Sequence, residues 1–294
     1  MVRGPRRFAL PRGRIAQLVE GKVRVLGLDL REQAVVGPGG LRAFGALADG
    51  TLLVVGGRET CILARESGVA WCFPKLTVGA DLTWAWGDSR APRRFWLMEG
   101  SFLGGNELPA AAGTKVKPLG ELEAPEDAVP FGDGRMAVLG AVAIFLFGPS
   151  GVRRVGLPDG LRVEHVVAVD GDVAWASDGA KLFRLDLSGE AAVVDRRAGG
   201  GGTIVSLDAD AERVATLVAE GAPGARPRWS VEVLDARGAV RWRAATPFQP
   251  PMSEQGHLAV ALGRFDSIVA VGDERRLAVW DLASQTLLAE RGGI

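Results

Sequence analysis

The sequence predicts an all-β fold in which one small unit is repeated along the chain. Apolar residues occur in short runs of about four to eight, which suit strands better than helices of about ten or more residues. The 294 residues include 41 Gly and 16 Pro, and this content favours many turns and few long helices. Turn residues that follow an apolar run also recur at intervals of about 40 residues, which indicates a repeat.

The clearest copy of the unit lies near the C-terminal end of the chain. Its apolar runs are separated by turns that begin with glycine, which tolerates positive φ, and that contain aspartate, which can hydrogen-bond to its own backbone. Four consecutive strands of this kind form a small antiparallel meander. We expect these strands at residues 258–262, 267–271, 277–282 and 286–289.

Two dipeptides give this unit a resemblance to a known family. Gly256-His257 precedes the first strand, and Trp280-Asp281 lies in the third. With these dipeptides the unit resembles a WD40 repeat, a propeller blade of about 40 to 45 residues that carries Gly-His and Trp-Asp. The resemblance implies that His257 and Trp280 stabilise the blade as parts of a buried hydrogen-bonded tetrad, which in that family also contains a Ser or Thr and an Asp.

The two histidines of the chain occupy the same slot in two units. His165 lies 21 residues before Asp186, and His257 lies 24 residues before Asp281, and each histidine precedes an apolar strand. We therefore expect both histidines to be structural and not catalytic. The residues that we expect to stabilise the blades are His165, Asp186, His257, Trp280 and Asp281.

An apolar strand followed by a turn, like the third strand of this unit and the turn after it, recurs along the chain. We call each copy of this strand and turn a mark. The marks have a mean spacing of about 42 residues, which is typical of propeller blades. Another apolar strand precedes each mark, as at residues 51–55 and 213–218. We therefore predict a seven-bladed β-propeller of four-stranded antiparallel blades, and six blades are the alternative if the poorest mark, near residue 105, is discarded. The turns of the marks lie near residues 32, 68, 105, 151, 189, 238 and 285.

The chain is expected to form a single propeller domain over residues 13–294, preceded by a basic N-terminal arm over residues 1–12. Because the last unit carries its own outer strand, the first blade would be built mainly from residues 6–37. No apolar segment of signal-peptide type follows the basic N-terminus. The longest apolar run, 136–147, is too short to span a bilayer. We expect a cytoplasmic bacterial protein that does not bind membranes.

Charge and cysteine content limit the classes of function. The 35 basic and 35 acidic residues balance, so no global field attracts nucleic acid, whose binding would need a local patch. Cys61 and Cys72, the two cysteines, lie eleven residues apart in apolar surroundings. They could pair in an oxidising compartment, but buried free thiols are the commoner outcome.

The sequence contains no pattern that supports catalysis or metal binding. It has no Cys-x-x-Cys, no His-x-His, no Gly-x-Ser-x-Gly and no phosphate-binding loop. We therefore expect no catalytic residues, no cofactor and no bound metal. Five aspartates could face a central channel, although turn positions are more typical of Asp beside Gly or between strands. They are Asp81, Asp170, Asp172, Asp208 and Asp210.

Partner binding is expected in the segments that differ between units. Three connections are longer than a tight turn, at residues 105–127, 219–228 and 246–255, and surface loops on a rigid scaffold often carry specificity. Trp84 and Trp86 share one strand face at period two and form either an aromatic platform or part of the core. The candidate partner-binding residues are Arg6, Arg7, Lys115, Lys117, Arg226, Arg228, Trp84 and Trp86.

The combined reading is a non-catalytic protein–protein interaction scaffold, a monomeric propeller within a bacterial multi-protein assembly. Bacterial propellers of similar appearance occur beside MoxR-type ATPases and von Willebrand A proteins, so the resemblance implies such an assembly as a setting. The alternative is a propeller hydrolase or lyase with its site in the central channel. A third option, nucleic-acid binding through the arginines of the arm and of one face, predicts strong salt dependence.

Overall fold

The structure is a computed structural model of the 294-residue chain, and the strands and many turns are described. In part of the N-terminal half only the backbone of the strands is described. The described residues are 8–9, 13–36, 40–41, 43–46, 52–55, 59–64, 68–74, 83–87, 94–99, 102–107, 117–121, 127–130, 135–148, 151–168, 171–199, 202–222, 225–249, 258–263, 267–273 and 275–292.

The described strands form seven four-stranded antiparallel sheets, here called A to G, and each sheet consists of four strands that are consecutive in sequence. Sheet A contains β1 (Phe8–Ala9), β2 (Ile15–Val19), β3 (Lys22–Leu26) and β4 (Glu32–Val36). Sheet B contains β5 (Ala43–Ala46), β6 (Leu52–Val55), β7 (Glu59–Ala64) and β8 (Gly68–Pro74). Sheet C contains β9 (Thr83–Gly87), β10 (Arg94–Glu99), β11 (Phe102–Glu107) and β12 (Lys117–Glu121).

The remaining four sheets follow the same plan. Sheet D contains β13 (Asp127–Pro130), β14 (Met136–Leu139), β15 (Ala143–Gly148) and β16 (Gly151–Gly156). Sheet E contains β17 (His165–Ala168), β18 (Val173–Ser177), β19 (Lys181–Asp186) and β20 (Val193–Gly199). Sheet F contains β21 (Thr203–Ala209), β22 (Arg213–Glu220), β23 (Arg228–Asp235) and β24 (Val240–Ala245). Sheet G contains β25 (Ala259–Leu262), β26 (Ile268–Gly272), β27 (Leu277–Asp281) and β28 (Thr286–Arg291).

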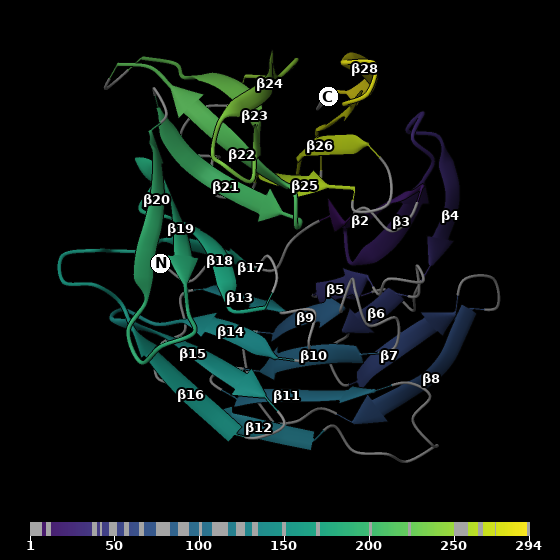
Figure 1. The fold of residues 1–294 in the computed structure, drawn as a ribbon. Helices are drawn as coiled ribbons and strands as arrows, with labels where there is room; N and C mark the ends of the chain where they lie inside the picture. The colour runs from purple at the N-terminus through teal and green to yellow at the C-terminus, as the bar shows by residue number, and fades with distance from the viewer. Residues whose placement is uncertain are drawn as a thin grey trace.

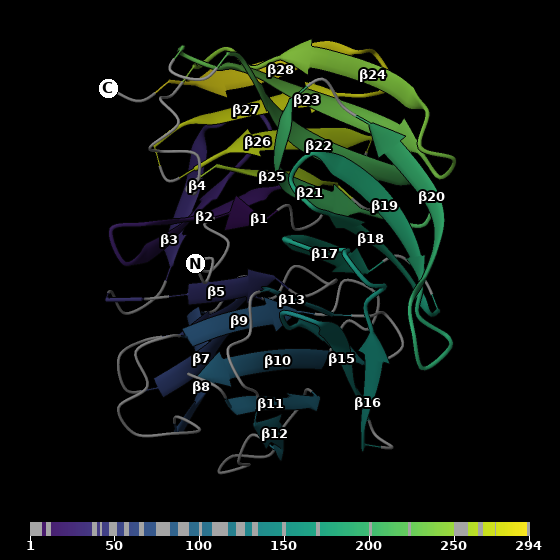
Figure 2. The ribbon, with the colours of Figure 1, turned by 90° about the vertical axis from the view of Figure 1, so that its left-hand side faces the viewer.

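The sheets are arranged radially, as in a β-propeller. In Figure 1 the first strands β5, β9, β13, β17, β21 and β25 gather around a common centre, and the fourth strands lie at the periphery. The view in Figure 2 shows sheets F and G on one side of the ring and sheets C and D on the other. The prediction of an all-β fold with four-stranded antiparallel units is therefore confirmed. Residues 8–9 pair with β2, so sheet A begins inside the segment that was predicted to be an arm.

The hydrophobic core lies between neighbouring sheets. Sheets D, E and F share one buried apolar cluster that includes Trp175 and Phe183. Further clusters join sheet F to sheet G, sheet A to sheet B, and sheet C to sheet D. Because sheets A, D, E, F and G each share apolar clusters with two neighbours, the described core is divided among the gaps between sheets and is not one central core.

Hydrogen bonds and bulges explain the mark that recurs in the sequence. In sheets A, B, C, E, F and G a β-bulge interrupts the pairing of the third and fourth strands, which increases the local twist. In four sheets an Asp at or just after the end of the third strand accepts a hydrogen bond from the backbone N–H two residues later. These residues are Asp29 (3.1 Å), Asp186 (2.8 Å), Asp235 (2.8 Å) and Asp281 (2.7 Å).

The turn predicted near residue 105 is wrong. Gly104 and Gly105 lie inside β11, where they pair with Leu97 and Trp96 of β10. The strand around Phe95 is therefore the second strand of sheet C and not the third, and the strand that carries Trp84 and Trp86 is the first. The connection predicted at residues 105–127 also contains β12. The two glycines weaken the apolar pattern of β11, which explains the error.

The ring closes between the first and the last sheet through side chains. Gln17 of β2 is fully buried, and its amide nitrogen donates a hydrogen bond to the backbone oxygen of Asp273 in sheet G. The amide oxygen of Gln17 accepts a hydrogen bond from the guanidinium of Arg291 at the end of β28. Beside these bonds, Ile15 and Leu26 pack against an apolar cluster of sheet G. Sheet A consists of the first four described strands of the chain, and sheet G consists of the last four. This agrees with the expectation that the C-terminal unit carries its own outer strand.

Replacing Gln17 with Leu should weaken this closure. The variant keeps the side-chain size but leaves the Asp273 carbonyl and the Arg291 guanidinium without their buried partner, which should lower the free energy of unfolding by about 1–3 kcal/mol. Urea denaturation followed by tryptophan fluorescence measures the change. Gln33→Leu, at an exposed position of the same sheet, serves as the matched control. Equal unfolding midpoints for the two variants would contradict the role of Gln17.

Candidate functional site

Two of the connections predicted to carry specificity meet at one end of sheet F. The connection between β22 and β23 is described at residues 221–222 and 225–227, and the link that leaves β24 begins at Thr246. The backbone N–H of Thr246 donates to the carbonyl of Trp229 at 2.9 Å, which continues the pairing of β23 and β24 beyond the end of β24. We call residues 225–228 and 246–249 the loop pair.

One glutamine ties the two halves of the loop pair together. The side-chain oxygen of Gln249 accepts a hydrogen bond from the backbone N–H of Trp229 at 2.9 Å, and its side-chain nitrogen donates to the carbonyl of Thr246 at 3.0 Å. The backbone oxygen of Gln249 accepts a bond from Nε of Arg226 at 2.8 Å. The hydroxyl of Thr246 also donates to the carbonyl of Phe248 at 2.5 Å. These bonds link Arg226 and Trp229 to the segment that follows β24.

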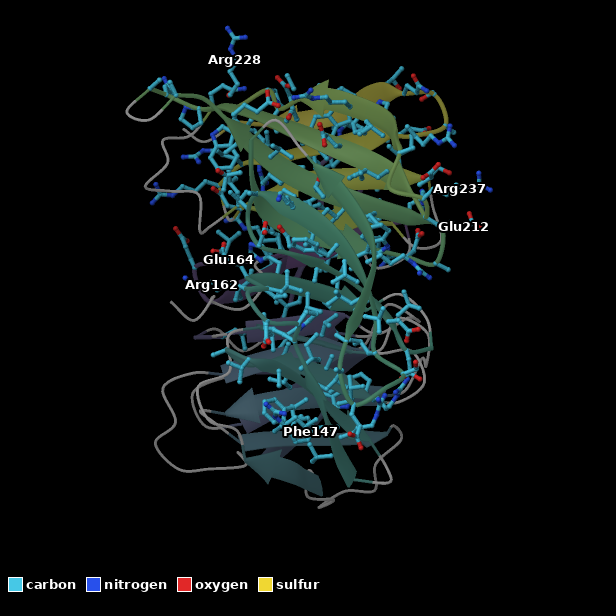
Figure 3. The ribbon with its side chains drawn as sticks, turned by 60° about the vertical axis from the view of Figure 1, so that its left-hand side comes forward. Phe147, Arg162, Glu164, Glu212, Arg228 and Arg237 are labelled. Carbon is cyan, nitrogen blue, oxygen red and sulfur yellow. The ribbon has the colours of Figure 1, made fainter. Side chains whose placement is uncertain are left out.

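The loop pair rests on the apolar cluster between sheets F and G. Trp229 is fully buried and Phe248 is 9% exposed, and both belong to that cluster. Pro227 is buried, whereas Arg226 and Arg228 on either side of it are exposed. The alternation turns both arginines outward, because the buried proline faces the core. Figure 3 shows Arg228 projecting from the sheet, far from Arg237 and Glu212 at its other end.

A cluster of charges lies directly beside the loop pair on sheet F. The guanidinium of Arg243 forms ion pairs with Glu220, at the end of β22, and with Glu232 of β23, where Nε lies 3.4 Å from the carboxylate. Burial raises the pKa of Glu232 above its ordinary value of 4.5; Arg243 opposes this shift and the nearby Glu220 adds to it. The charge of Glu232 therefore destabilises the folded chain.

This shift predicts how Glu232→Gln changes the dependence of stability on pH. Above pH 4.5 and up to its raised pKa, folded Glu232 keeps a proton that the unfolded chain releases, so stability decreases as the pH rises through that window. The variant lacks this titration. Its stability relative to the unchanged protein should therefore increase between pH 4 and pH 7, as measured by melting temperatures in a buffer series. A constant difference across the series would contradict the assignment.

The other predicted partner-binding residues are only partly described. Arg6, Arg7 and Lys115 lie outside the described residues, and for Lys117 in β12 only the backbone is described. Trp84 and Trp86 lie in β9, which belongs to the first strands nearest the centre of the ring, and their side chains are not described. The register places Trp86 opposite Trp96 of β10, whose side chain is buried in the cluster between sheets C and D.

Two of the predicted blade residues lie in the interior. His165 is 3% exposed and stands opposite Ser177, whose hydroxyl accepts a hydrogen bond from the backbone N–H of Gly179 at 2.9 Å. Trp280 is 4% exposed and makes an edge-to-face contact with Trp242 of sheet F, with ring centroids 5.9 Å apart. His257 lies outside the described residues. Burial between sheets fits a stabilising role for His165 and Trp280.

Asp186 and Asp281 serve the turns in which they stand. The hydroxyl and the backbone N–H of Ser188 lower the pKa of Asp186, because both groups donate hydrogen bonds to its carboxylate. The carboxylate of Asp281 accepts bonds from the backbone N–H groups of Ala283 and Ser284. A backbone bond from Ala239 lowers the pKa of Asp235 in the same way in sheet F.

Of the five aspartates that could face a channel, three are described, and each has a structural partner. The carboxylate of Asp172 forms ion pairs with two guanidinium groups of sheet D, those of Arg135 (N to O, 2.6 Å) and Arg153 (N to O, 2.8 Å). Asp210 pairs with Arg213 in its own turn. Asp81 and Asp170 lie outside the described residues. Within the described part of the chain, His, Cys, Asp and Glu form no group of three that could hold a metal ion.

Asp208 has a role that sequence reasoning missed. Its buried carboxylate accepts a hydrogen bond from the backbone N–H of Leu262 in β25 at 2.9 Å. The hydroxyl of Ser206 accepts a bond from Val260 N–H at 3.2 Å. These two side chains of β21 therefore bond to edge donors of β25, next to the centre of the ring. Their spacing of two residues is the signal that places both on one strand face.

The two cysteines stand on paired strands. Cys61 in β7 lies directly opposite Cys72 in β8, the outer strand of sheet B. Their side chains are not described. No helix in the described part of the chain is long and apolar enough to cross a bilayer.

Comparison with solved structures identifies the architecture. No protein-family model matches the chain, and no curated protein matches it in sequence. Hsv2p from Kluyveromyces lactis superposes with a TM-score of 0.63 at 10% identity, over 99% of this chain and 97% of that one. The chain has a β-propeller fold. Sqt1 from Saccharomyces cerevisiae gives a TM-score of 0.62 at 8% identity, over 99% of this propeller and 86% of Sqt1.

An enzyme is among the structures that this propeller resembles. Dihydro-heme d1 dehydrogenase NirN, in complex with DHE, gives a TM-score of 0.60 at 15% identity, over 97% of this chain and 66% of NirN. At such identities the likeness shows the fold alone, because propellers with one architecture carry unrelated functions.

Proposed function

We propose that this chain is a non-catalytic scaffold that binds a protein partner through the loop pair of sheet F. In this proposal the seven sheets are the blades of one seven-bladed propeller domain. The observation that carries the proposal is the network centred on Gln249, which holds two connections from different parts of the chain in one outward-facing surface. A surface ordered before binding loses little conformational entropy when a partner docks.

The distribution of titratable groups supports binding over catalysis. Active sites gather residues with shifted pKa values in one cleft. Among the described residues, the groups with shifted pKa values lie at separate positions in sheets E, F and G and have structural partners. Asp186 and Asp235 serve turns in sheets E and F, Glu232 lies in the ion-pair cluster of sheet F, and Arg291 closes the ring.

The setting that we propose is a bacterial cytoplasmic assembly, of the kind in which propellers occur beside a MoxR-type ATPase and a von Willebrand A protein. The chain would act there as a monomeric propeller within a hetero-complex. A propeller hydrolase or lyase with a site in the central channel is the alternative, and it predicts a metal ion or a small molecule that stays bound during purification.

Affinity capture of the full chain from its source cells tests the proposal. The unchanged chain should retain a stoichiometric protein partner after cross-linking, as measured by quantitative mass spectrometry. Gln249→Ala removes the two side-chain bonds that order the loop pair, so recovery of the partner should fall at least about tenfold, the equivalent of about 1.4 kcal/mol. Glu212→Ala, an exposed change at the other end of sheet F, should leave recovery unchanged.

Two results would contradict the scaffold proposal. One is the absence of any stoichiometric partner for the unchanged chain. The other is a metal ion or small molecule that copurifies with the chain and gives it turnover. A melting temperature for each variant, measured in parallel, shows whether lost capture follows from lost folding, because Gln249→Ala should leave sheet F folded.

A further inference from the structure

We infer that the loop pair binds an extended acidic segment of the partner, with Arg226 and Arg228 each holding one carboxylate. This inference rests on the proposed function and adds the chemistry that the partner must carry. It starts from the two arginines that flank the buried Pro227.

The spacing of the arginines suits an extended peptide. Residues two apart on an extended chain lie about 6.5 Å apart and share one face. An acidic peptide in the same conformation presents carboxylates at the same spacing on alternate residues. Arginine binds carboxylate through two parallel N–H bonds, so each arginine can hold one acidic side chain. A pair of such contacts specifies both charge and spacing.

The charges of sheet F leave these two arginines available. Arg213 pairs with Asp210 and Arg241 with Asp235, both at 2.6 Å. Glu220 stands opposite Arg228 in the register, but its carboxylate is bound by Arg243. Within the described residues, no carboxylate lies within ion-pair distance of Arg226 or Arg228.

Arg226 is also held in position. Its Nε donates to the carbonyl of Gln249 at 2.8 Å, which fixes the guanidinium while leaving both terminal nitrogens for a ligand. Gln249 is in turn fixed by Trp229 and Thr246. Because the side chain is ordered before binding, less rotamer entropy is lost when a carboxylate docks.

A short acidic peptide fits this surface better than a nucleic acid. Polyanions are attracted by extended positive fields, and their affinity grows with the number of phosphates that are neutralised. This chain has a formal net charge of zero, and the surface offers two arginines. Two carboxylates match the charge of the two arginines, whereas most of the negative charge of a nucleic-acid backbone would remain without a basic partner.

Fluorescence anisotropy with labelled probes tests the inference on the full chain. The acidic probe is a (Ser-Glu)4 peptide, and the comparison probes are (Ser-Lys)4 and a dT12 oligonucleotide. The chain should bind (Ser-Glu)4 in preference to both. Arg226→Glu with Arg228→Glu should weaken this binding at least about tenfold, since the two carboxylate-binding groups are replaced by groups that repel carboxylates. Arg237→Glu, an exposed arginine at the other end of the sheet, should change it less than about twofold.

Three results would overturn the acidic-segment inference. They are equal binding of (Ser-Glu)4 and (Ser-Lys)4, an equal effect of the control variant, and tighter binding of dT12 that depends on the same arginines. The milder pair Arg226→Gln with Arg228→Gln, checked by melting temperature, guards against misfolding. If partner capture survives these substitutions but is lost in Gln249→Ala, the scaffold proposal stands and the acidic segment falls.

A second inference rests on the backbone of sheet B alone. We infer that Cys61 and Cys72 can form a cross-strand disulfide that joins the outer strand β8 to β7. The two residues are directly opposite in register. Opposite residues of antiparallel strands have Cα atoms about 4.5 or 5.5 Å apart, and disulfides span about 4.4–6.8 Å. The sequence favoured buried free thiols and kept pairing as the alternative in an oxidising compartment; the register shows that distance is no obstacle to pairing.

The reaction is thiol–disulfide exchange with a small disulfide such as oxidised glutathione. One cysteine thiolate attacks the glutathione disulfide, which forms a mixed disulfide and releases one glutathione thiolate. The thiolate of the other cysteine then attacks the mixed disulfide at the protein sulfur, which forms the Cys61–Cys72 bond and releases the second glutathione. The two cysteines are oxidised, one glutathione disulfide is reduced, and the two thiol protons pass to the released glutathione or to solvent.

Mass spectrometry of the full chain after incubation with oxidised glutathione tests this reaction. The expected product lacks two hydrogens, carries no glutathione, and yields one cross-linked peptide that contains both cysteines. Cys61→Ser and Cys72→Ser should each stop at the glutathione adduct. Retention of glutathione on the unchanged chain, or alkylation of both cysteines in denaturant after the oxidation, would overturn the inference.

Discussion

A four-stranded sheet of this size cannot bury either of its faces alone, and the whole structure depends on a neighbour being present on each side of it. Sheets D, E and F illustrate the constraint, because one continuous apolar cluster runs through all three. The constraint is most demanding where the first and last sheets meet. There the buried Gln17 bonds to Asp273 and Arg291, while Ile15 and Leu26 supply the apolar contact. Since the two sheets come from opposite ends of the chain, this junction can form only after both have been made.

The sequence predicted what depends on local pattern. The strands of sheet G coincide with short apolar runs that are separated by turns. The turn aspartates Asp186 and Asp281 accept hydrogen bonds from backbone N–H groups only two or three residues later. Sheet C was placed one strand out of step, because Gly104 and Gly105 dilute the apolar character of β11. Contacts between distant segments were beyond such reasoning. Nothing in the sequence near Gln249 indicates that it bonds to Trp229, and nothing near Asp208 indicates that it bonds to β25. Such contacts can be predicted only when the three-dimensional arrangement of the strands is known.

Residues of sheet F that stabilise the propeller also position the loop pair, the surface that we propose for partner binding. Trp229 contributes its ring to the core between sheets F and G and its backbone to the loop pair. Arg243 binds the carboxylate of Glu220, and by doing so it leaves Arg228 across the strand pair without that partner. The charge available at the loop pair is therefore influenced by an ion pair that lies beside it. A substitution in the cluster around Glu232 can change the properties of the loop pair without touching it.

Each sheet is formed by one uninterrupted stretch of the chain, including the two that close the ring. A ring closed by a strand shared between both chain ends would be left with a broken sheet after any insertion or loss of a unit at the junction. Here a single segment of coding sequence corresponds to a complete sheet, so duplication or deletion of that segment changes the number of units while every sheet stays whole. The junction of sheets A and G therefore joins two sheets that are each complete before they meet, and its side-chain bonds and apolar contacts add to two finished hairpin ladders.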